Sequence, residues 1–366
     1  MHTTKTFVKK IQIASVLFGA VFFFGLSISN VHAITLSPAR VEVAGEPGET
    51  VVFKTTVINE LAAPAVLYSS FANFEAQGDS GTPALSEATD DLGTWMTVPD
   101  SLSLSPGGSQ DVDIKLVIPK DATPGGHFAA VFWGNQPKKL VPGQVGIGAK
   151  TGILILLTVK GDIPEDGGVT IFDTVGGKRF FSALPISFYY RFQNGGGDRI
   201  LPSGDVVIKN TIGITSKRIP GNPVEGNILP RSTRKFTTHW VGRDGDTGVV
   251  PSGFFAAANY QFHNFAFGKY SAHLKLTYGS KGLITDSVVR VFVFPWQLLV
   301  LVIVILTAIF FGIKTALYHY NKWVIGKAEA MLEEIEEREE QEDIAAGRPV
   351  QHHFHHHDTH PDEHSK

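Results

Sequence analysis

The sequence predicts a mainly β protein, with two tandem Ig-like β-sandwich domains followed by one C-terminal transmembrane α-helix. Three observations carry this prediction. Between Ile34 and Phe294, short runs alternate apolar and polar side chains, which is the period of a half-buried strand. Clusters of Gly and Pro separate these runs at the spacing typical of a sandwich. One uncharged apolar stretch, Trp296–Ile313, follows near the C-terminus.

The apolar stretch is long enough to cross a lipid bilayer. Its residues would rise about 27 Å as a helix, close to the thickness of the hydrocarbon core. Trp296 stands at one end, and Tyr318 and Trp323 stand beyond the other, as in the aromatic belts of membrane proteins. The alternative is a buried core helix, but apolar residues on every face argue against it. We therefore predict a membrane span over residues 295–320.

Residues 1–33 have the pattern of a secretory signal peptide. Lys5, Lys9 and Lys10 precede the apolar segment Ile11–Ile28, and Val31-His32-Ala33 is a small-residue cleavage pattern. The alternative is an uncleaved N-terminal anchor, and in both cases the following segment is exported. Lysines also follow the span, at Lys314, Lys322 and Lys327. We therefore predict a single-pass protein of the cell membrane, with its N-terminus outside and its C-terminus in the cytoplasm.

The exported part divides into two halves at a polar segment rich in Gly and Pro, Gly161–Gly168. We predict one sandwich over residues 34–161 and a second, membrane-proximal one over residues 162–294, with no helix in either. The strands expected in the first are Thr50–Val57, Val66–Phe74, Asp111–Leu116, Gly126–Trp133 and Thr151–Val159. Those in the second are Ile186–Phe192, Asp205–Lys209, Arg234–Val241, Phe254–Phe262, Tyr270–Tyr278 and Ile284–Phe294.

The two halves share three short patterns in the same order, which predicts a repeated module. Each half has a strand that ends in asparagine, at Asn59 and at Asn194. The segment Leu104–Ser109 precedes an alternating strand, as does Leu229–Thr233. The third pair is Gly126–Ala130 and Gly268–Ala272.

Several of these motifs carry a family resemblance. They are Pro47–Thr50 leading into Val57–Asn59, then Trp95, Leu104–Gly108 and Ile118–Phe128. Together they resemble the peptidoglycan-binding domain of WxL-interacting proteins, which are bacterial cell-surface proteins. The segments Phe192–Gly195, Leu201–Asp205 and Ile228–Pro230 are similar to the membrane-proximal domain of that family. The resemblance implies attachment to cell-wall polymer or to a partner surface protein. Its motifs are turn and strand-edge residues, so they carry over no binding residue.

The exported residues do not suggest catalysis. The histidines His127, His239, His263 and His273 each stand alone in a predicted strand, and Asp90-Asp91 offers too few ligands for a calcium loop. The chain has no cysteine, which excludes disulfides and Cys-zinc sites. We expect no enzyme activity, no cofactor and no nucleic-acid partner.

Charge and aromatic residues are unevenly distributed. Residues 34–161 carry a net charge of −5 and residues 162–294 a net charge of +5. The basic half would suit an anionic bilayer surface, unless its charges are scattered and solvated. Six aromatic residues crowd one region, and we favour a sheet covered on both faces over exposed rings that bind a ligand. They are Phe180, Phe181, Phe188, Tyr189, Tyr190 and Phe192.

Residues 321–366 form the predicted cytoplasmic tail, an acidic helix followed by a disordered segment rich in histidine. Nine acidic residues lie in Glu329–Asp343. Imidazole clusters bind Zn²⁺, Cu²⁺ or Ni²⁺, so we predict a loose chelating site, with a functionless polar tail as the alternative. Its ligands would be His352, His353, His355, His356, His357, His360 and His364.

The predicted function is therefore non-catalytic. A membrane-anchored cell-surface protein would bind cell-wall polymer or a partner surface protein through its Ig-like domains. The alternative is an envelope sensor or assembly scaffold that couples an external ligand to the acidic, His-rich tail.

Overall fold

The computed structural model describes residues 33–136, 148–243 and 248–345. It confirms the predicted class, two β-sandwiches followed by one long apolar helix. The chain forms two compact units. The first, Met1–Phe181, Pro185–Val241 and Phe267–Val293, holds the strands, and the second, Ser182–Leu184, Gly242–Ala266 and Phe294–Lys366, holds the two long helices. The predicted signal peptide, up to residue 32, and the histidines of the tail lie outside the described residues.

The first sandwich has two sheets, with strand orders β1-β3-β8-β6 and β2-β10-β9-β4-β5, and β7 pairs with β4. A four-residue helix, α2 (Leu92–Trp95), precedes β6. The strands are β1 (Ile34–Ser37), β2 (Arg40–Gly45), β3 (Thr50–Asn59), β4 (Ala65–Gln77), β5 (Thr82–Glu87), β6 (Met96–Thr97), β7 (Ser101–Leu104), β8 (Ser109–Val117), β9 (Gly125–Gly134) and β10 (Lys150–Val159).

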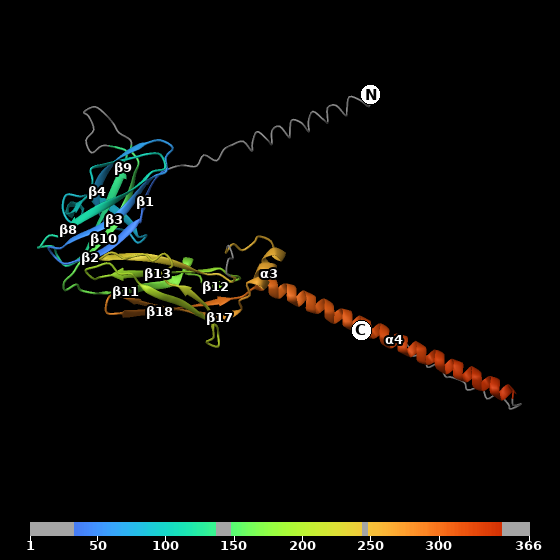
Figure 1. Cartoon of the computed structure of the whole chain (residues 1–366). Coiled ribbons are helices and arrows are strands. Elements are labelled where there is room, and N and C mark those ends of the chain that lie inside the picture. Colours follow the sequence, from blue (N-terminus) through green and yellow to red (C-terminus); the bar gives the residue numbers. More distant parts are fainter. Residues whose placement is uncertain (1–32, 137–147, 244–247, 346–366) are drawn as a thin grey trace, which may run out of the picture. The chain divides into compact units, whose positions relative to one another are not determined.

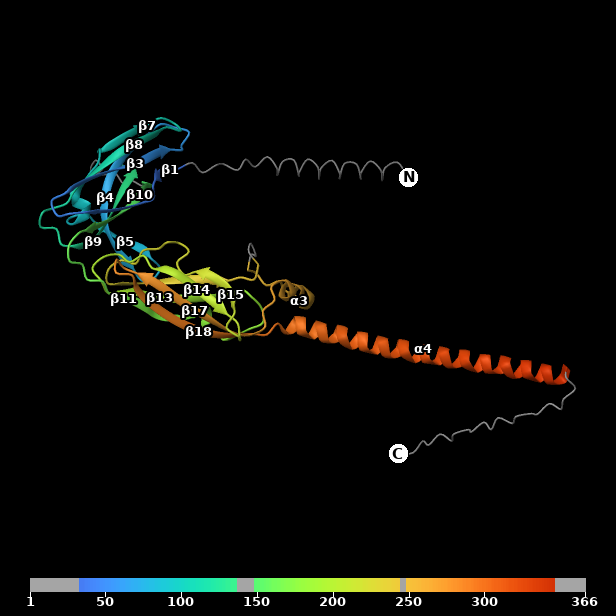
Figure 2. The ribbon, with the colours of Figure 1, turned by 60° about the horizontal axis from the view of Figure 1, so that its bottom comes forward.

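The second sandwich has the strand orders β11-β13-β16 and β12-β18-β17-β14-β15. Figure 2 shows β14, β15, β17 and β18 side by side in this sandwich. A short 3₁₀ turn, η1 (Val175–Gly177), separates β11 from β12. The strands are β11 (Gly167–Thr174), β12 (Phe180–Phe181), β13 (Ile186–Asn194), β14 (Ser203–Lys209), β15 (Thr215–Pro220), β16 (Ser232–Trp240), β17 (Gly268–Tyr278) and β18 (Leu283–Val293).

The two sandwiches share a topology, except that β6 and β7 of the first have no counterpart in the second. In the first sandwich, β1 pairs antiparallel with β3. The chain then crosses to the other sheet, where β2 pairs parallel with β10. In the second, β11 pairs antiparallel to β13 and β12 then pairs parallel to β18. The three shared sequence patterns fall on equivalent strands: the ends of β3 and β13, the starts of β8 and β16, and the starts of β9 and β17.

Alternating side chains build each core. In β8, Val112, Ile114 and Leu116 are buried, whereas the residues between them are exposed. Burial of each such side chain contributes about 1.5–3 kcal/mol. In β13, Phe188, Tyr190 and Phe192 are fully buried.

The other face of β13 is partly covered. Lys235 lies over the ring of Tyr189, with its Nζ 4.9 Å from the ring centre. Of the six crowded aromatics, Phe180 is exposed. Three of the six rings are therefore core, Phe181 and Tyr189 are half-buried, and the sheet is fully covered on one face only.

The strand predicted over Phe254–Phe262 is wrong, because the structure has a helix there, α3 (Phe254–His263). Its sequence contains Ala256-Ala257-Ala258, and alanine has the highest helix propensity. The buried residues Ala257, Ala258 and Gln261 have helical spacing and form one face. The expectation of no helix before the span is therefore also wrong.

The C-terminal helix α4 runs unbroken from Trp296 to Ala345 (Figure 1). Its 50 residues rise about 75 Å, more than twice the thickness of a hydrocarbon core. By length and composition it is apolar enough to cross a membrane. The predicted span thus lies within a longer helix that continues through the acidic segment.

Candidate binding cleft

The first unit contains a cleft over the outer face of the sheet β2-β10-β9-β4-β5. Phe74 of β4, Phe128 of β9 and Leu156 of β10 are buried on this face, and Leu229 of the second sandwich packs against them. The rings of Phe74 and Phe128 lie 5.8 Å apart. Strand β9 is buried on both of its faces, which is why it carries apolar residues almost throughout. These side chains form the apolar floor of the cleft.

One end of the cleft is acidic and wide. Its volume is 500 Å³, which lies within the range of ligand sites in proteins. Glu75, Asp90 and Asp91 line it from the first sandwich, and Arg231 lines it from the second. The side-chain amide of Asn73 donates to the backbone oxygen of Asp90 at 2.8 Å and so holds this wall. The arrangement places several hydrogen-bond acceptors opposite one guanidinium.

A buried histidine anchors the acidic wall. Nδ1 of His127 lies 2.5 Å from Oδ1 of Asp91, and its Nε2 lies 2.8 Å from the carbonyl oxygen of Thr123. The carbonyl of Thr123 accepts, and an ionised Asp91 carboxylate also accepts, so this geometry favours the form of the ring in which both nitrogens carry a proton. Burial alone lowers the pKa of His127, but the hydrogen bonds to Asp91 and Thr123 outweigh it, and the pKa is raised. Trp95 packs beside the ring, with centroids 4.8 Å apart.

The other end of the cleft is basic and narrow, with a volume of 80 Å³. Arg40 and Arg234 both line it, and Nη1 of Arg234 donates to the backbone oxygen of Asn227 at 2.7 Å. The guanidinium of Arg234 lies between Gly81 and Gly226. A Cβ atom added to Gly81 would lie 2.3 Å from Cζ of Arg234, and one added to Gly226 would lie 2.6 Å from it. Burial, and then the charge of Arg40, lower the pKa of Arg234.

Acidic groups of the first sandwich pair with basic groups of the second beside this cleft. Glu42 binds Arg199 at 3.2 Å and also accepts from the amide of Asn227 at 2.8 Å. Asp79 binds Arg191 at 2.8 Å. Part of the excess negative charge of the first sandwich therefore pairs with part of the excess positive charge of the second. Arg191 and Arg199 are two of the cations engaged in this way.

The other histidines that the structure describes before α4 are each engaged separately. His239 pairs with the hydroxyl of Ser187 at 2.8 Å, and His273 with that of Ser271 at 2.9 Å. His263 lies 2.8 Å from the backbone oxygen of Asn259. Among the described residues, no three His, Cys, Asp or Glu side chains gather in a way that could hold a metal ion. The predicted metal ligands, His352 to His364, lie outside those residues and stay a prediction.

Sequence reasoning did not find the cleft. Its floor comes from three strands that are distant in the chain, and its opposite wall comes from the other sandwich. The one local signal was Asp90-Asp91, which we considered as a calcium ligand pair. The structure instead gives Asp91 the ring of His127 as its partner.

No protein-family model and no curated protein matches this chain. Among solved structures, it is similar to the class 5 fimbriae chaperone CfaA, with 12% identity and a TM-score of 0.34, over 71% of this chain and 99% of that one. The E. coli chaperone DraB has 14% identity and a TM-score of 0.29, over 71% and 99%. PapD-like domain 7 of human CEP192 has 17% identity and a TM-score of 0.25, over 37% and 96%. The strand pairings make this chain a tandem Ig-like sandwich protein, and no functional residue is transferred from these structures.

Proposed function

We propose that this is a non-catalytic, membrane-anchored cell-surface protein, similar to WxL-interacting proteins, whose cleft binds cell-wall polymer. The observation that carries the proposal is the polarity of the cleft. Carboxylates and the guanidinium of Arg231 lie at its wide end, Arg40 and Arg234 lie at its narrow end, and an apolar floor lies between the two ends.

This polarity fits the chemistry of peptidoglycan. Its sugars carry hydroxyl and amide groups, and its stem peptides carry both ammonium and carboxylate groups. Glu75 and Asp90 offer acceptors for hydroxyl and ammonium donors, and Arg231 offers a fork that matches a carboxylate. The cleft thus offers both kinds of partner along one path.

The internal pairing of the site supports a binding role without catalysis. Asp91 and His127 bind each other, and the second ring nitrogen of His127 donates to Thr123. Both ring nitrogens are engaged by protein groups, so neither is directed at a ligand as a general base. We propose binding as the sole activity of this cleft.

Membrane attachment is the second part of the proposal. Helix α4 begins with the apolar stretch at Trp296, and lysines follow that stretch at Lys314, Lys322 and Lys327. By the positive-inside rule these cations favour a cytoplasmic C-terminus. The sandwiches would then lie outside the cell, where wall polymer is available.

Co-sedimentation of the full-length protein in detergent with purified sacculi tests the binding. The variant Glu75→Gln with Arg231→Gln removes two charged groups from the cleft. We expect its apparent affinity to fall about tenfold or more, because a hydrogen bond to a charged group contributes roughly 1.5–3 kcal/mol.

The matched control is Asp113→Asn with Lys54→Gln, which removes two charges from exposed paired residues on β8 and β3. We expect this control to sediment like the wild type. Equal sedimentation of the cleft variant would contradict the proposal. Binding that disappears when the sacculi are stripped of proteins would point to a partner surface protein instead.

The continuity of α4 favours a second candidate function, an envelope sensor or assembly scaffold. The helix has no break between the apolar stretch and the acidic segment Glu329–Asp343. A continuous helix can transmit a rotation or displacement from one end to the other. Loss of a cytoplasmic protein from pull-downs after removal of residues 329–366 would support this function, and unchanged recovery of all cytoplasmic proteins would exclude it.

A further inference from the structure

Helix α3 exposes two phenylalanines on one flank. Phe255 is 74% exposed and Phe262 is 66% exposed, and their spacing of seven residues brings them to the same side of the helix. Two further exposed rings, Phe265 and Phe267, follow directly after the helix. Asn259 lies between the two phenylalanines on this flank, whereas His263 is turned about 100° away from Phe262. The helix therefore has one packed face and one exposed flank that carries two phenylalanines and one asparagine.

The packed face of α3 joins the start of α4. Gln261, which is buried, accepts a hydrogen bond from the backbone N–H of Leu298 at 2.9 Å. Its amide nitrogen lies 2.5 Å from the side-chain oxygen of Gln297 and also donates to the backbone oxygen of Ser182. The first N–H groups of any helix lack partners within it, so Gln261 supplies an acceptor that α4 needs. Phe254 adds an edge contact to Trp296, with centroids 5.9 Å apart.

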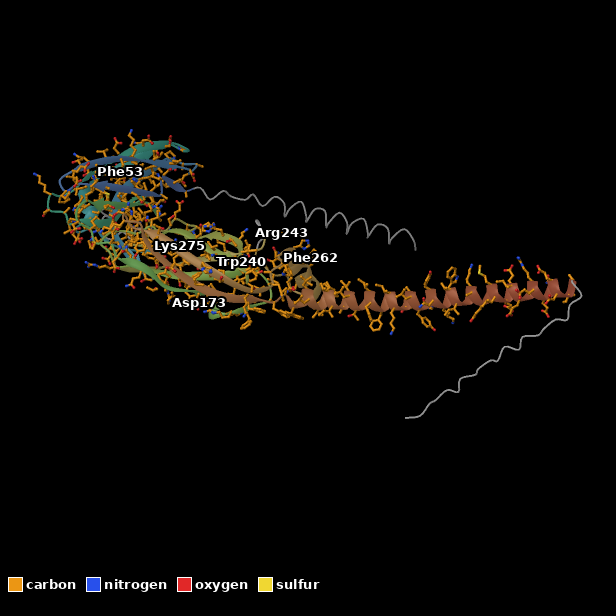
Figure 3. The ribbon with its side chains drawn as sticks, turned by 90° about the horizontal axis from the view of Figure 1, so that it is seen from below. Phe53, Asp173, Trp240, Arg243, Phe262 and Lys275 are labelled. Atoms are coloured by element: carbon orange, nitrogen blue, oxygen red, sulfur yellow. The ribbon has the colours of Figure 1, made fainter. Side chains whose placement is uncertain are left out.

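This attachment places the exposed rings beside the first residues of the apolar stretch. Figure 3 shows Phe262 on α3 next to the start of α4. The segment 247–268 contains no Asp, Glu, Lys or Arg, and a cation follows at Lys269. A segment with aromatic rings and no charge, flanked by a basic residue, has the composition of a helix that lies in a membrane interface.

We propose that α3 is a second membrane-contacting element, which lies in the lipid interface with Phe255 and Phe262 inserted among the acyl chains. This inference rests on the proposed membrane span, because it needs the start of α4 at the bilayer surface. A lipid surface is the occupant that fits, since the patch is continuous with an apolar helix and presents no charged group to a protein partner. The helix would fix the angle and depth at which the span begins.

Site-directed spin labelling of the full-length protein in phospholipid vesicles tests this proposal. The chain has no cysteine, so each cysteine substitution gives one label at a known place. The test positions are Phe255→Cys and Phe262→Cys, and His263→Cys, about 100° round the same helix from Phe262, is the matched control. Ile309→Cys reports the span itself, and Asp113→Cys on the exposed side of β8 reports bulk water.

We expect labels at Phe255 and Phe262 to collide several-fold more with oxygen and less with a water-soluble nickel complex than the label at His263. Nickel accessibility at Phe262 equal to that at Asp113 would overturn the proposal, as would shielding from both reagents, which indicates a protein cover. Equal values at Phe262 and His263 would also overturn the assigned orientation. Nickel access at Ile309 would instead show that the span is wrong, so the two failures are distinguishable.

Discussion

At the scale of single residues, two asparagines hold equivalent turns. Asn59 and Asn194, each the last residue of its strand, are both fully buried. In each, the side-chain oxygen accepts from the backbone N–H two residues later. The side-chain nitrogen of Asn59 donates to the backbone oxygens of Ala63 and Leu104. That of Asn194 donates in the same way to the backbone oxygens of Asp198 and Ile228. A buried asparagine with equivalent hydrogen bonds in both sandwiches supports a repeated module.

We expect Asn59→Ala and Asn194→Ala each to lower the free energy of unfolding by about 1–3 kcal/mol. The substitution leaves buried backbone groups without partners, and that loss sets the magnitude. Denaturant unfolding of the full-length protein would measure it. The exposed Asn135→Ala is the control, and equal midpoints for all three variants would contradict the assigned role.

His127 should make stability depend on pH. Its pKa is raised in the folded protein because hydrogen bonds to Asp91 and Thr123 exceed the cost of burial. Its stabilising contribution is therefore complete below about pH 6.5, the unfolded value, and is lost as pH rises through the folded pKa. We expect the stability difference between wild type and His127→Gln to shrink from pH 5.5 to about pH 8.5.

Thermal unfolding across that pH range would check this expectation. The variant Asp91→Asn should show the same reduced dependence, because it removes the carboxylate that stabilises the imidazolium. A stability difference that grows with pH would mean that the ring is neutral in the fold.

At the scale of elements, α3 shows why a run of residues can mislead. The segment Phe254–Phe262 is rich in aromatics, which favour strands, yet three consecutive alanines and the buried Gln261 belong to a helix. What decides between them is the packing of one face against α4, which no local pattern contains.

Gln261→Leu should loosen the junction between α3 and α4. The variant keeps a similar volume but removes the acceptor for the N–H of Leu298. We expect faster hydrogen exchange at the Leu298 amide, by about tenfold for each 1.4 kcal/mol lost. Asn259→Leu, on the exposed side of the same helix, is the control. Unchanged exchange in Gln261→Leu would show that this hydrogen bond does not hold the junction.

At the scale of the whole molecule, charge and hydropathy divide the chain into an acidic sandwich, a basic sandwich and an apolar helix. The acidic sandwich and the basic one pair through Glu42, Asp79, Arg191 and Arg199 in the first unit. The second unit holds the apolar helix and α3. We expect the two sandwiches to unfold together, because these ion pairs and the backbone hydrogen bond from Lys235 to Asp79 join them.

The proposed topology predicts a simple protection pattern. Protease added to intact cells should digest the region before Phe294 and spare the tail after Lys327, because the bilayer separates them. Immunoblots against each end would detect the fragments. A protected N-terminal region would reverse the orientation, and digestion of both ends would remove the membrane span.

The tail from residue 344 to residue 366 should bind Cu²⁺ more tightly than Zn²⁺, following the Irving–Williams order for imidazole ligands. Binding should be lost below about pH 6 as the imidazoles protonate. Calorimetry on a peptide of these residues at two pH values would test both points. Absence of heat with either metal at neutral pH would leave the tail as a polar segment.

The sequence by itself determined the sandwiches, the apolar helix and most long strands. Each follows from a periodic pattern within one element, such as the alternation in β8 or the uncharged run after Trp296. The strands β1, β2, β5, β6, β7, β11, β12 and β15 were not predicted. Strand β5 illustrates the reason, because it has no buried residue and so no apolar face that could set a period.

Only the tertiary structure decided the cleft, the His127–Asp91 pair and the helical state of α3. Asp91 and His127 are 36 residues apart, and Leu229 reaches the cleft floor from the other sandwich. Their proximity depends on which strands pair and on how the sandwiches pack. That choice is made by the burial of the whole core and not by any local segment, so a local pattern could not foretell it.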